Sequence, residues 1–388
     1  MQDSRLWTTE FLSMSGSNFL LFMAHYILIA SLPIFIMQSL GGGDIEAGIA
    51  MTFFQIGTIF CRPFAGKLID SVNKRRLLAL ATALFFLIML IFNFVQTLTE
   101  VYALRLIHGA VFALSTTAAA AMATMVLPMT RKGEGIGYFA LSTNLAMVVG
   151  PLIGLVIIGS FSSSALFLFL TGVSIFTFII ANFKRLPDTV ILPSPRSKKG
   201  FQLSDFIERK SVAAAFLGGL VFFAYGGVLT FIPLYATSLG LQSETSVFFA
   251  VFAAVIVLSR PFIGRIFDSK GPDYTVYPGF VFFALGMILF GQITTLTGLL
   301  VSAAILGLGF GALSPAFQTL AVRSAPLSRS GVATATYFWS LDISVGLAAV
   351  VLGLVASLWG YPFMYSYLST GVIIITALLY FCWRKKSH

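Results

Sequence analysis

The stretch Arg-Pro-Phe-Ala-Gly-Lys-Leu-Ile-Asp-Ser at residues 62–71 returns as Arg-Pro-Phe-Ile-Gly-Arg-Ile-Phe-Asp-Ser at residues 260–269. Six of the ten positions are identical, and shorter matches keep an offset of 198–200 residues, such as Ala113-Leu114-Ser115 with Ala312-Leu313-Ser314. A repeat of this kind indicates two related halves in the same orientation. Carriers that rock two helical bundles about a central site are commonly built in this way.

The composition places most of this chain in lipid. Of its 388 residues, 58% are hydrophobic and only 10% are charged, and the mean hydropathy is +0.95. A soluble domain has about 25% charged residues, so the solvent for most of this chain is a bilayer. The net charge of +10 would suit a nucleic-acid surface in a soluble protein. Here the basic residues lie instead in loops between apolar stretches, so we expect no nucleic-acid partner.

Twelve stretches of the chain are long and apolar enough to span a membrane, for which about 20 residues are needed. They are residues 11–37, 46–69, 76–96, 99–127, 133–159, 163–183, 211–237, 244–267, 275–292, 296–322, 329–357 and 361–383. The repeat groups them into two pseudo-symmetric six-helix bundles, residues 1–184 and 211–388. A polar, basic linker at residues 185–210 joins the bundles. We therefore expect an all-α membrane protein with twelve transmembrane helices.

The positions of the basic residues give the orientation. They gather in alternate loops, in the linker and at the C-terminus, whereas the six other loops contain no Lys or Arg. By the positive-inside rule both termini face the cytoplasm, and we expect a multi-pass protein of the bacterial inner membrane. The two cysteines, Cys61 and Cys382, are expected to be free thiols because no disulfide framework is apparent.

The end of the first decamer and the loop after it form a further pattern. Within the decamer, Gly66 permits close packing of helices, and Asp70 is placed to cap a helix N-terminus or to pair with a base. Basic residues follow within six positions of Asp70 and include Lys74 and Arg75. Asn73 lies where a left-handed turn is expected, which Asn tolerates. Such a contact of the aspartate would latch the halves on the cytoplasmic side. The second copy keeps Gly264 and Asp268 but lacks the basic run, so we expect the latch of that half to be weaker.

This pattern resembles the first signature of the major facilitator superfamily, and the resemblance extends over nearly the whole chain. In the fourth span, Arg105 followed by His108 and Gly109 is similar to a second signature of that family. An arginine at the middle of a bilayer is costly and normally faces a cavity with a partner. The alternative is a snorkelling arginine near the outer interface. The repeat places Ala304 opposite Arg105, so only one half carries this charge.

The fifth span resembles the glycine and proline signature of the antiporters of this superfamily. Its residues are Gly137, Gly150, Pro151 and Gly154. Small residues and a proline allow close packing and bending of the span. Ordinary packing of small residues is the alternative interpretation. The resemblance implies export by proton antiport, with a drug as the typical substrate.

Two titratable residues lie deep in predicted spans and are candidates for proton coupling together with Arg105. Asp342 lies near the middle of the eleventh span, and its ionisation would depend on access to water. Its approximate repeat mate is Asn144. His25 lies midway along the first span and titrates near neutrality. The alternatives are a polar contact between helices for Asp342 and simple lining of the cavity for His25.

A central cavity of aromatic residues with a few polar anchors suits amphipathic, poorly specific substrates. The candidates for its lining are Asn18, His25, Tyr225, Asn144, Tyr138, Phe338, Trp339, Gln55 and Gln318. We therefore expect a monomeric multidrug-type antiporter rather than an enzyme, with protons as coupling ion, no cofactor and no metal site. Its partners would be a small-molecule substrate and the lipid bilayer. The alternatives are a dedicated exporter of one metabolite, such as a sugar, siderophore or lipid precursor, and an uptake symporter.

Overall fold

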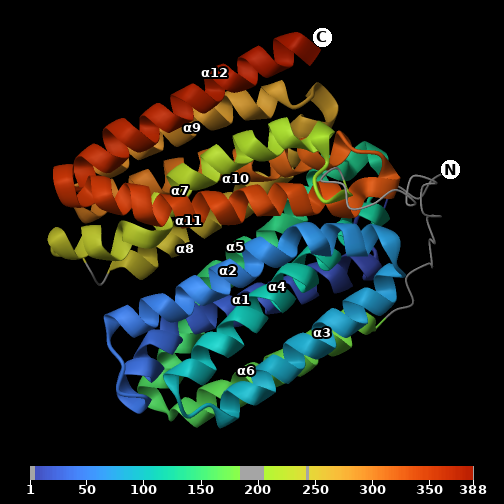
Figure 1. Ribbon diagram of the computed structural model, residues 1–388. Helices are drawn as coiled ribbons and strands as arrows, with labels where there is room; N and C mark the ends of the chain where they lie inside the picture. The colour runs from blue at the N-terminus through green and yellow to red at the C-terminus, as the bar shows by residue number, and fades with distance from the viewer. Residues whose placement is uncertain (1–4, 184–204, 242–243, 388) are drawn as a thin grey trace. The chain divides into compact units, whose positions relative to one another are not determined.

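The computed structural model describes residues 5–183, 205–241 and 244–387, and in these ranges the chain is helical without a strand (Figure 1). Most of the predicted linker, residues 185–204, lies outside the described residues. The first six long helices are α1 (Thr9–Ser39), α2 (Asp44–Ser71), α3 (Lys74–Ile91), α4 (Leu98–Val126), α5 (Lys132–Ser160) and α6 (Ser163–Asn182). The others are α7 (Val212–Ser238), α8 (Thr245–Lys270), α9 (Asp273–Gly291), α10 (Leu296–Arg323), α11 (Ser330–Phe363) and α12 (Thr370–Ser387).

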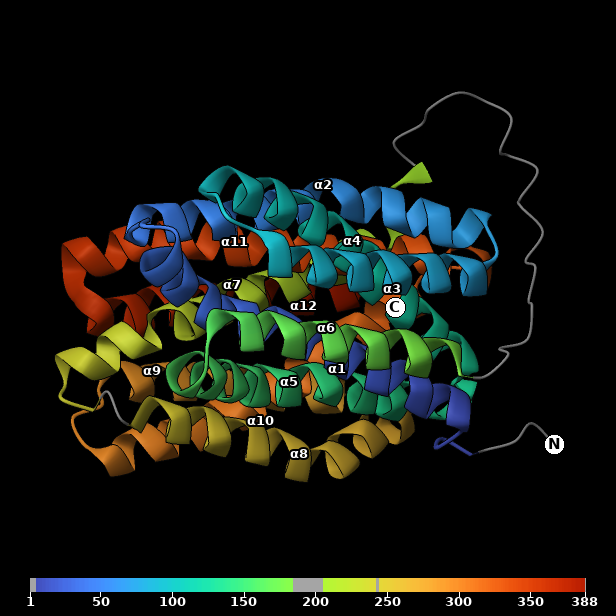
Figure 2. The same ribbon diagram turned by 90° about the horizontal axis from the view of Figure 1, so that it is seen from below.

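The chain forms two compact units. The first comprises the described residues within 1–128, 139–208 and 325–339, and the second comprises those within 129–138, 209–324 and 340–388. In the first unit α2 packs along α4 and α3 along α6, and in the second α10 packs along α9 and α8 (Figures 1 and 2). Helix α11 thus starts in the first unit and continues in the second, whereas α5 starts in the second unit and continues in the first.

Ten stretches of the described residues are long and apolar enough to cross a membrane, so the expected count of twelve is not confirmed. Helix α2 is not among the ten, and its sequence includes five charged residues, Asp44, Glu46, Arg62, Lys67 and Asp70. Residues 330–385 form one stretch that includes α11, a π-helical turn and α12. Gly360, with φ 80°, interrupts this stretch in a conformation that glycine adopts without steric cost.

The helix ends explain one expectation that is wrong. Asn73 does not adopt a left-handed turn, since its φ is −62° and its ψ is 109°. Its side chain instead accepts a hydrogen bond from the backbone N–H of Arg76 at 3.1 Å. Asn73 is therefore the N-cap of α3 and binds an N–H group that the first helical turn leaves unpaired.

Helices α2 and α4 approach closely because glycine faces backbone on both sides. A Cβ atom at Gly57 would lie 2.1 Å from the carbonyl oxygen of Leu106, and one at Gly109 would lie 2.1 Å from that of Phe54. No side chain fits at either position without separating the helices. Close approach at small residues is the usual basis of helix packing in membranes.

We expect Gly109→Ala to destabilise the first unit, since the new methyl group overlaps the backbone of α2. Overpacking of this kind costs about 1–3 kcal/mol, so the thermal unfolding midpoint of the purified protein should fall. Gly48→Ala is the matched control, because no atom lies within 4 Å of its Cβ position. An unchanged midpoint for Gly109→Ala would contradict the packing described here.

Candidate functional site

The carboxylate of Asp70 binds the first turn of α11. Its Oδ1 accepts a hydrogen bond from the N–H of Gly331 at 2.9 Å, and its Oδ2 accepts one from the N–H of Val332 at 2.8 Å. The first N–H groups of a helix lack intrahelical partners and carry partial positive charge, so a carboxylate is stabilised there. We call the contact of Asp70 with Gly331 and Val332 the first latch.

Two further residues of the pattern support the first latch. A Cβ atom at Gly66 would lie 2.5 Å from Cβ of Ala335, so glycine lets α2 reach the start of α11. Lys74 Nζ lies 3.8 Å from Asp70 Oδ1 and donates to the carbonyl oxygen of Ile69. Arg75 is half-exposed. Burial raises the pKa of the Asp70 carboxyl, while the N–H groups of Val332 and Gly331 and the charge of Lys74 act in the opposite direction.

Asp268 forms the equivalent contact in the second unit. Its Oδ1 accepts the N–H of Gly133 at 3.0 Å and its Oδ2 accepts the N–H of Glu134 at 2.8 Å, at the start of α5. We call the contact of Asp268 with Gly133 and Glu134 the second latch. A Cβ atom at Gly264 would lie 2.8 Å from Cα of Glu134. Gly264 and Asp268 therefore do in this unit what Gly66 and Asp70 do in the first.

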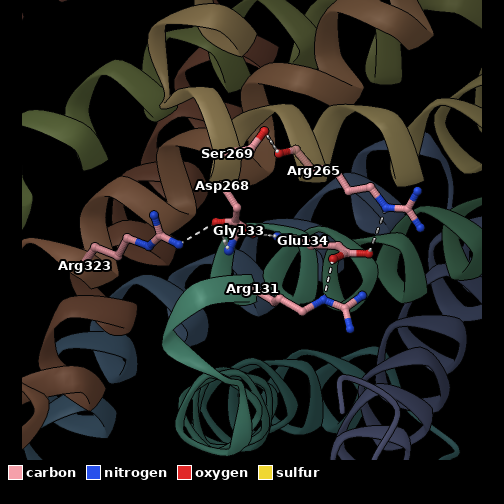
Figure 3. A network of polar contacts seen from close by, with 7 residues as sticks. All are labelled: Arg131, Gly133, Glu134, Arg265, Asp268, Ser269 and Arg323. Atoms are coloured by element: carbon pink, nitrogen blue, oxygen red, sulfur yellow. Dashed lines mark hydrogen bonds and ion pairs between the residues drawn. The ribbon is translucent and has the colours of Figure 1, made fainter. Parts of the chain in front are cut away.

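The second latch is surrounded by a network of charged residues (Figure 3). Arg323, the last residue of α10, donates from Nη2 to Asp268 Oδ1 at 2.6 Å. The Glu134 side chain pairs with Arg131 at 2.8 Å and lies 4.0 Å from Arg265. We expected this latch to be weaker because the basic run after Asp268 is missing. The structure supplies the base from α10 instead.

Residues 205–208, at the end of the predicted linker, contact the first unit beside the first latch. Glu208 forms an ion pair with Arg329, and its backbone N–H donates to Thr336 Oγ1 at 3.0 Å. Asp205 pairs with Lys67 at 3.0 Å. Residues 205–208 thus contact both α2 and α11, whose junction the first latch also holds.

A cluster of aromatic and basic side chains lies inside the first unit. The His25 ring stacks on Phe54 at 4.4 Å between centroids and lies 4.8 Å from Phe112. The Arg105 guanidinium lies 4.4 Å from the Phe54 centroid, and its Nη1 is 3.1 Å from His108 Nδ1. Arg105 is fully buried and forms no ion pair with a carboxylate among the described residues. The interpretation as a snorkelling arginine does not fit this burial.

The second unit contains the counterpart of this cluster. Tyr225, the repeat mate of His25, stacks on Phe310 at 4.0 Å and lies parallel to Phe252 at 5.7 Å between centroids. Phe252 and Phe310 occupy the positions of Phe54 and Phe112 at an offset of 198 residues. The repeat therefore preserves three stacked rings, to which the first unit adds the guanidinium of Arg105.

The remaining candidates for the cavity lie in different surroundings. Asn18 is fully buried and donates to Ser142 Oγ at 2.8 Å and to Thr143 Oγ1 at 2.9 Å, which connects α1 with α5. Gln318 on α10 is 3% exposed. Half-buried positions are occupied by Gln55 on α2 and by Tyr138 and Asn144 on α5. These candidates are divided between the two units, and their common cavity stays a prediction.

Asp342 and its predicted neighbours lie along α11. Asp342 is half-buried in the part of α11 that belongs to the second unit. Phe338 and Trp339 belong to the first unit, where the Phe338 centroid lies 5.2 Å from the guanidinium carbon of Arg62. The indole N–H of Trp339 donates to the carbonyl oxygen of Ile59 at 3.0 Å.

The glycines of the α5 signature allow close contacts with other helices. A Cβ atom at Gly150 would lie 2.7 Å from Cβ of Tyr26, and one at Gly154 would lie 3.0 Å from the carbonyl oxygen of Ile27. These contacts join α5 to α1, and Pro151 lies within the same part of α5. Gly137 instead faces the Arg260 side chain in the second unit, with 2.9 Å between its Cβ position and Arg260 Cδ.

Several residues in the latches or next to them were not predicted from the sequence. Glu134, Arg323, Glu208 and Arg329 take part in the contacts at the helix starts. The repeat could have indicated the backbone groups that the two aspartates bind, because Gly133 and Gly331 are 198 residues apart, the same offset as the decamers. In the part of the chain that the structure describes, no group of three His, Cys, Asp or Glu residues is placed to hold a metal ion.

The comparisons with known proteins agree with this architecture. The family model described as Major Facilitator Superfamily matches residues 14–349. An uncharacterized MFS-type transporter of Methanocaldococcus jannaschii is 24% identical over 97% of this chain and 96% of its own length. A second uncharacterized MFS-type transporter, from Burkholderia pseudomallei, is also 24% identical and is covered over 87% of its length.

A solved structure has the same fold. The crystal structure of the human organic anion transporter MFSD10 superposes with a TM-score of 0.82 over 96% of this chain and 98% of that chain. The two sequences are 14% identical, so the likeness concerns the fold alone. Taken with the match of the family model over most of the chain, it leads to one conclusion. This chain belongs to the Major Facilitator Superfamily and is a multi-pass membrane transporter.

Proposed function

We propose that this transporter exports small amphipathic compounds in exchange for protons by alternating access. One observation carries the proposal, namely that α11 links the first latch to a titratable residue in the membrane. Its first turn is bound by Asp70, and Asp342 lies twelve residues further along the same helix, or about 18 Å at the usual rise. A change of charge at Asp342 and a release of the latch therefore act on one rigid element.

The proposed cycle uses the two latches as contacts that form and break together. With the cytoplasmic ends closed, Asp342 faces the outside, takes up a proton and becomes neutral. The neutral side chain is tolerated in a closed, apolar environment, which favours the rearrangement that opens the cytoplasmic side. There the proton is lost to the higher pH, and the substrate binds to the ionised form. Each charge that crosses the membrane in this exchange contributes about 2.3 kcal/mol per 100 mV.

Export rather than uptake is supported by α5. This helix carries the glycine and proline pattern that resembles the antiporter signature, and the second latch binds its first turn. Each helix that a latch binds therefore carries a feature assigned to coupling. Helix α5 carries the pattern that resembles the antiporter signature, and α11 carries Asp342. The predicted orientation, with basic loops in the cytoplasm, places both latches on the cytoplasmic side.

A dedicated exporter of one anionic metabolite is the second candidate. Arg105 is buried beside His25 and His108 and has no carboxylate partner among the described residues. An excess of buried positive charge favours a negatively charged solute. A matched pair of probes, a fluorescent carboxylic acid and its amide, separates the candidates. A multidrug-type exporter moves both, whereas an anion exporter moves only the acid.

The test of the proposed function is transport by the purified protein in proteoliposomes with an imposed pH gradient. A panel of amphipathic dyes is offered on the alkaline side, and their movement toward the acidic side is followed by fluorescence. We expect uphill movement of at least one dye, abolished by a protonophore. Movement that is equally fast with and without the gradient would contradict proton coupling while leaving the transporter assignment intact.

A further inference from the structure

Matching positions of the two decamers place an exposed ring and a base on one face of a helix. Phe64 and Lys67 do so on α2, and Phe262 and Arg265 stand at the same positions of α8, 198 residues later. The two rings are 52% and 67% exposed. Residues three positions apart are neighbours on a helix surface. Each pair therefore forms one surface with an apolar part and a positive part.

The first unit shows which chemical groups bind such a surface, because the end of the linker covers it with one acid and one ring. Asp205 Oδ2 lies 3.0 Å from Lys67 Nζ. The Phe206 ring packs edge-on against the Phe64 ring at 5.1 Å between centroids, and its centroid is 4.6 Å from Lys67 Nζ. Phe206 is buried by these contacts. An anionic group joined to an apolar group thus complements this arrangement of side chains.

The matching surface of the second unit has no such cover within the described residues. The Arg265 side chain is 70% exposed, and the acid beside it is Glu134, with 4.0 Å between Nε and Oε1. Glu134 binds Arg131 more closely, at 2.8 Å. The Arg265 guanidinium forms no hydrogen bond within the part of the chain that the structure describes, and it points away from Asp268 (Figure 3). Its charge is therefore only partly compensated.

Exposed apolar side chains continue from Arg265 along the same face of α8. Leu258 and Phe262 precede it by seven and three positions, a spacing that places all three residues on one stripe. The stripe is about 10 Å long at the usual rise, and α8 is apolar enough to cross a membrane. Lys270, which is also exposed, follows where the first unit has Val72. Two bases at the end of an apolar stripe match an acyl chain that ends in an anionic headgroup.

We propose that one anionic phospholipid binds along this face of α8, with its phosphate at Arg265 and an acyl chain on Leu258 and Phe262. The charges of Arg265 and Lys270 favour a lipid with a net negative charge over a zwitterionic one. In the predicted orientation the site lies in the cytoplasmic leaflet, where anionic lipids are found. Arg265 lies beside Glu134, whose N–H the second latch uses, so the bound lipid stabilises the second unit around the start of α5. This inference does not depend on the proposed function.

The experiment titrates phosphatidylglycerol into the purified protein in an uncharged detergent and follows the thermal unfolding midpoint, while native mass spectrometry counts the lipids that the protein retains. A ligand that binds only the folded state raises this midpoint in a saturable manner. We expect such a rise with phosphatidylglycerol, a smaller one with phosphatidylcholine and none with inorganic phosphate. An equal rise with both lipids would show binding without recognition of charge, and an equal rise with inorganic phosphate would show a site for free anions. Either result would overturn the proposal.

Three variants make the assignment specific. Arg265→Gln should bind phosphatidylglycerol about fivefold more weakly, the loss expected for one basic residue near an anionic surface. Arg265→Lys keeps the charge and should retain most of the affinity. Lys67→Gln, at the repeat mate that Asp205 already pairs, is the control and should leave the affinity unchanged. Equal affinity in Arg265→Gln and the unmodified protein would place the lipid elsewhere and would refute the site.

Discussion

Replacement of Asp342 by asparagine is expected to lower gradient-driven transport at least tenfold and to leave substrate exchange without a gradient in place. Asparagine has nearly the same size and keeps a hydrogen-bonding side chain, but it cannot take up or release a proton. The substitution therefore removes the coupling step and retains the helix. Uptake of labelled substrate by proteoliposomes, with and without a pH gradient, measures both quantities.

The control for Asp342→Asn is Asp205→Asn. Asp205 forms an ion pair with Lys67 in which both side chains are partly exposed, and exposed pairs of this kind contribute little to stability. Its loss should leave driven transport unchanged. If Asp342→Asn transports its substrate normally against a gradient, Asp342 is not the proton carrier, and His25 is the remaining titratable candidate.

Replacement of Asp70 by alanine is expected to open the first latch. The substitution removes two hydrogen bonds from a charged acceptor, each contributing about 1.5–3 kcal/mol, and every 1.4 kcal/mol is a factor of about ten in a population. The latched form should therefore become rarer by on the order of a hundredfold or more. The two N–H groups at the start of α11 would then be free to bind water.

A cysteine at the start of α11 reports this opening. Ser330 is 3% exposed, so Ser330→Cys should react slowly with a membrane-impermeant maleimide while the latch is closed. The measurement uses a background without Cys61 and Cys382, and the labelling rate should rise when Asp70→Ala is added. Glu100→Ala, at the first turn of α4, is the control and should leave the rate unchanged. An unchanged rate in Asp70→Ala would show that Asp70 does not hold α11.

The repeated decamers made the positions of both latches predictable from the sequence. Gly66 with Asp70 and Gly264 with Asp268 occupy equivalent places because the repeat preserves the glycine that allows close approach and the acid four residues later. The partners were not predicted. Asp70 binds a residue 261 positions away, and no local pattern specifies such a contact.

Other parts of the site depend on packing that the sequence does not show. The apolar pattern and the single charge identified Arg105 as unusual, but its enclosure by Phe54, His108 and the backbone of Ala50 follows from the tertiary structure. Arg62 and Arg260 stand at matching positions of the two decamers, but Arg62 donates to Thr116 and Thr117, whereas Arg260 donates to the carbonyl oxygen of Gly311.

Proton movement driven by the substrate alone tests the central claim most directly. Proteoliposomes without an initial pH gradient, containing a pH-sensitive dye, receive a transported substrate on one side. If transport is an exchange for protons, substrate entry must move protons out, and the account predicts a rise of the internal pH in the unmodified protein and none in Asp342→Asn. Substrate that accumulates inside while the internal pH stays constant would contradict the account.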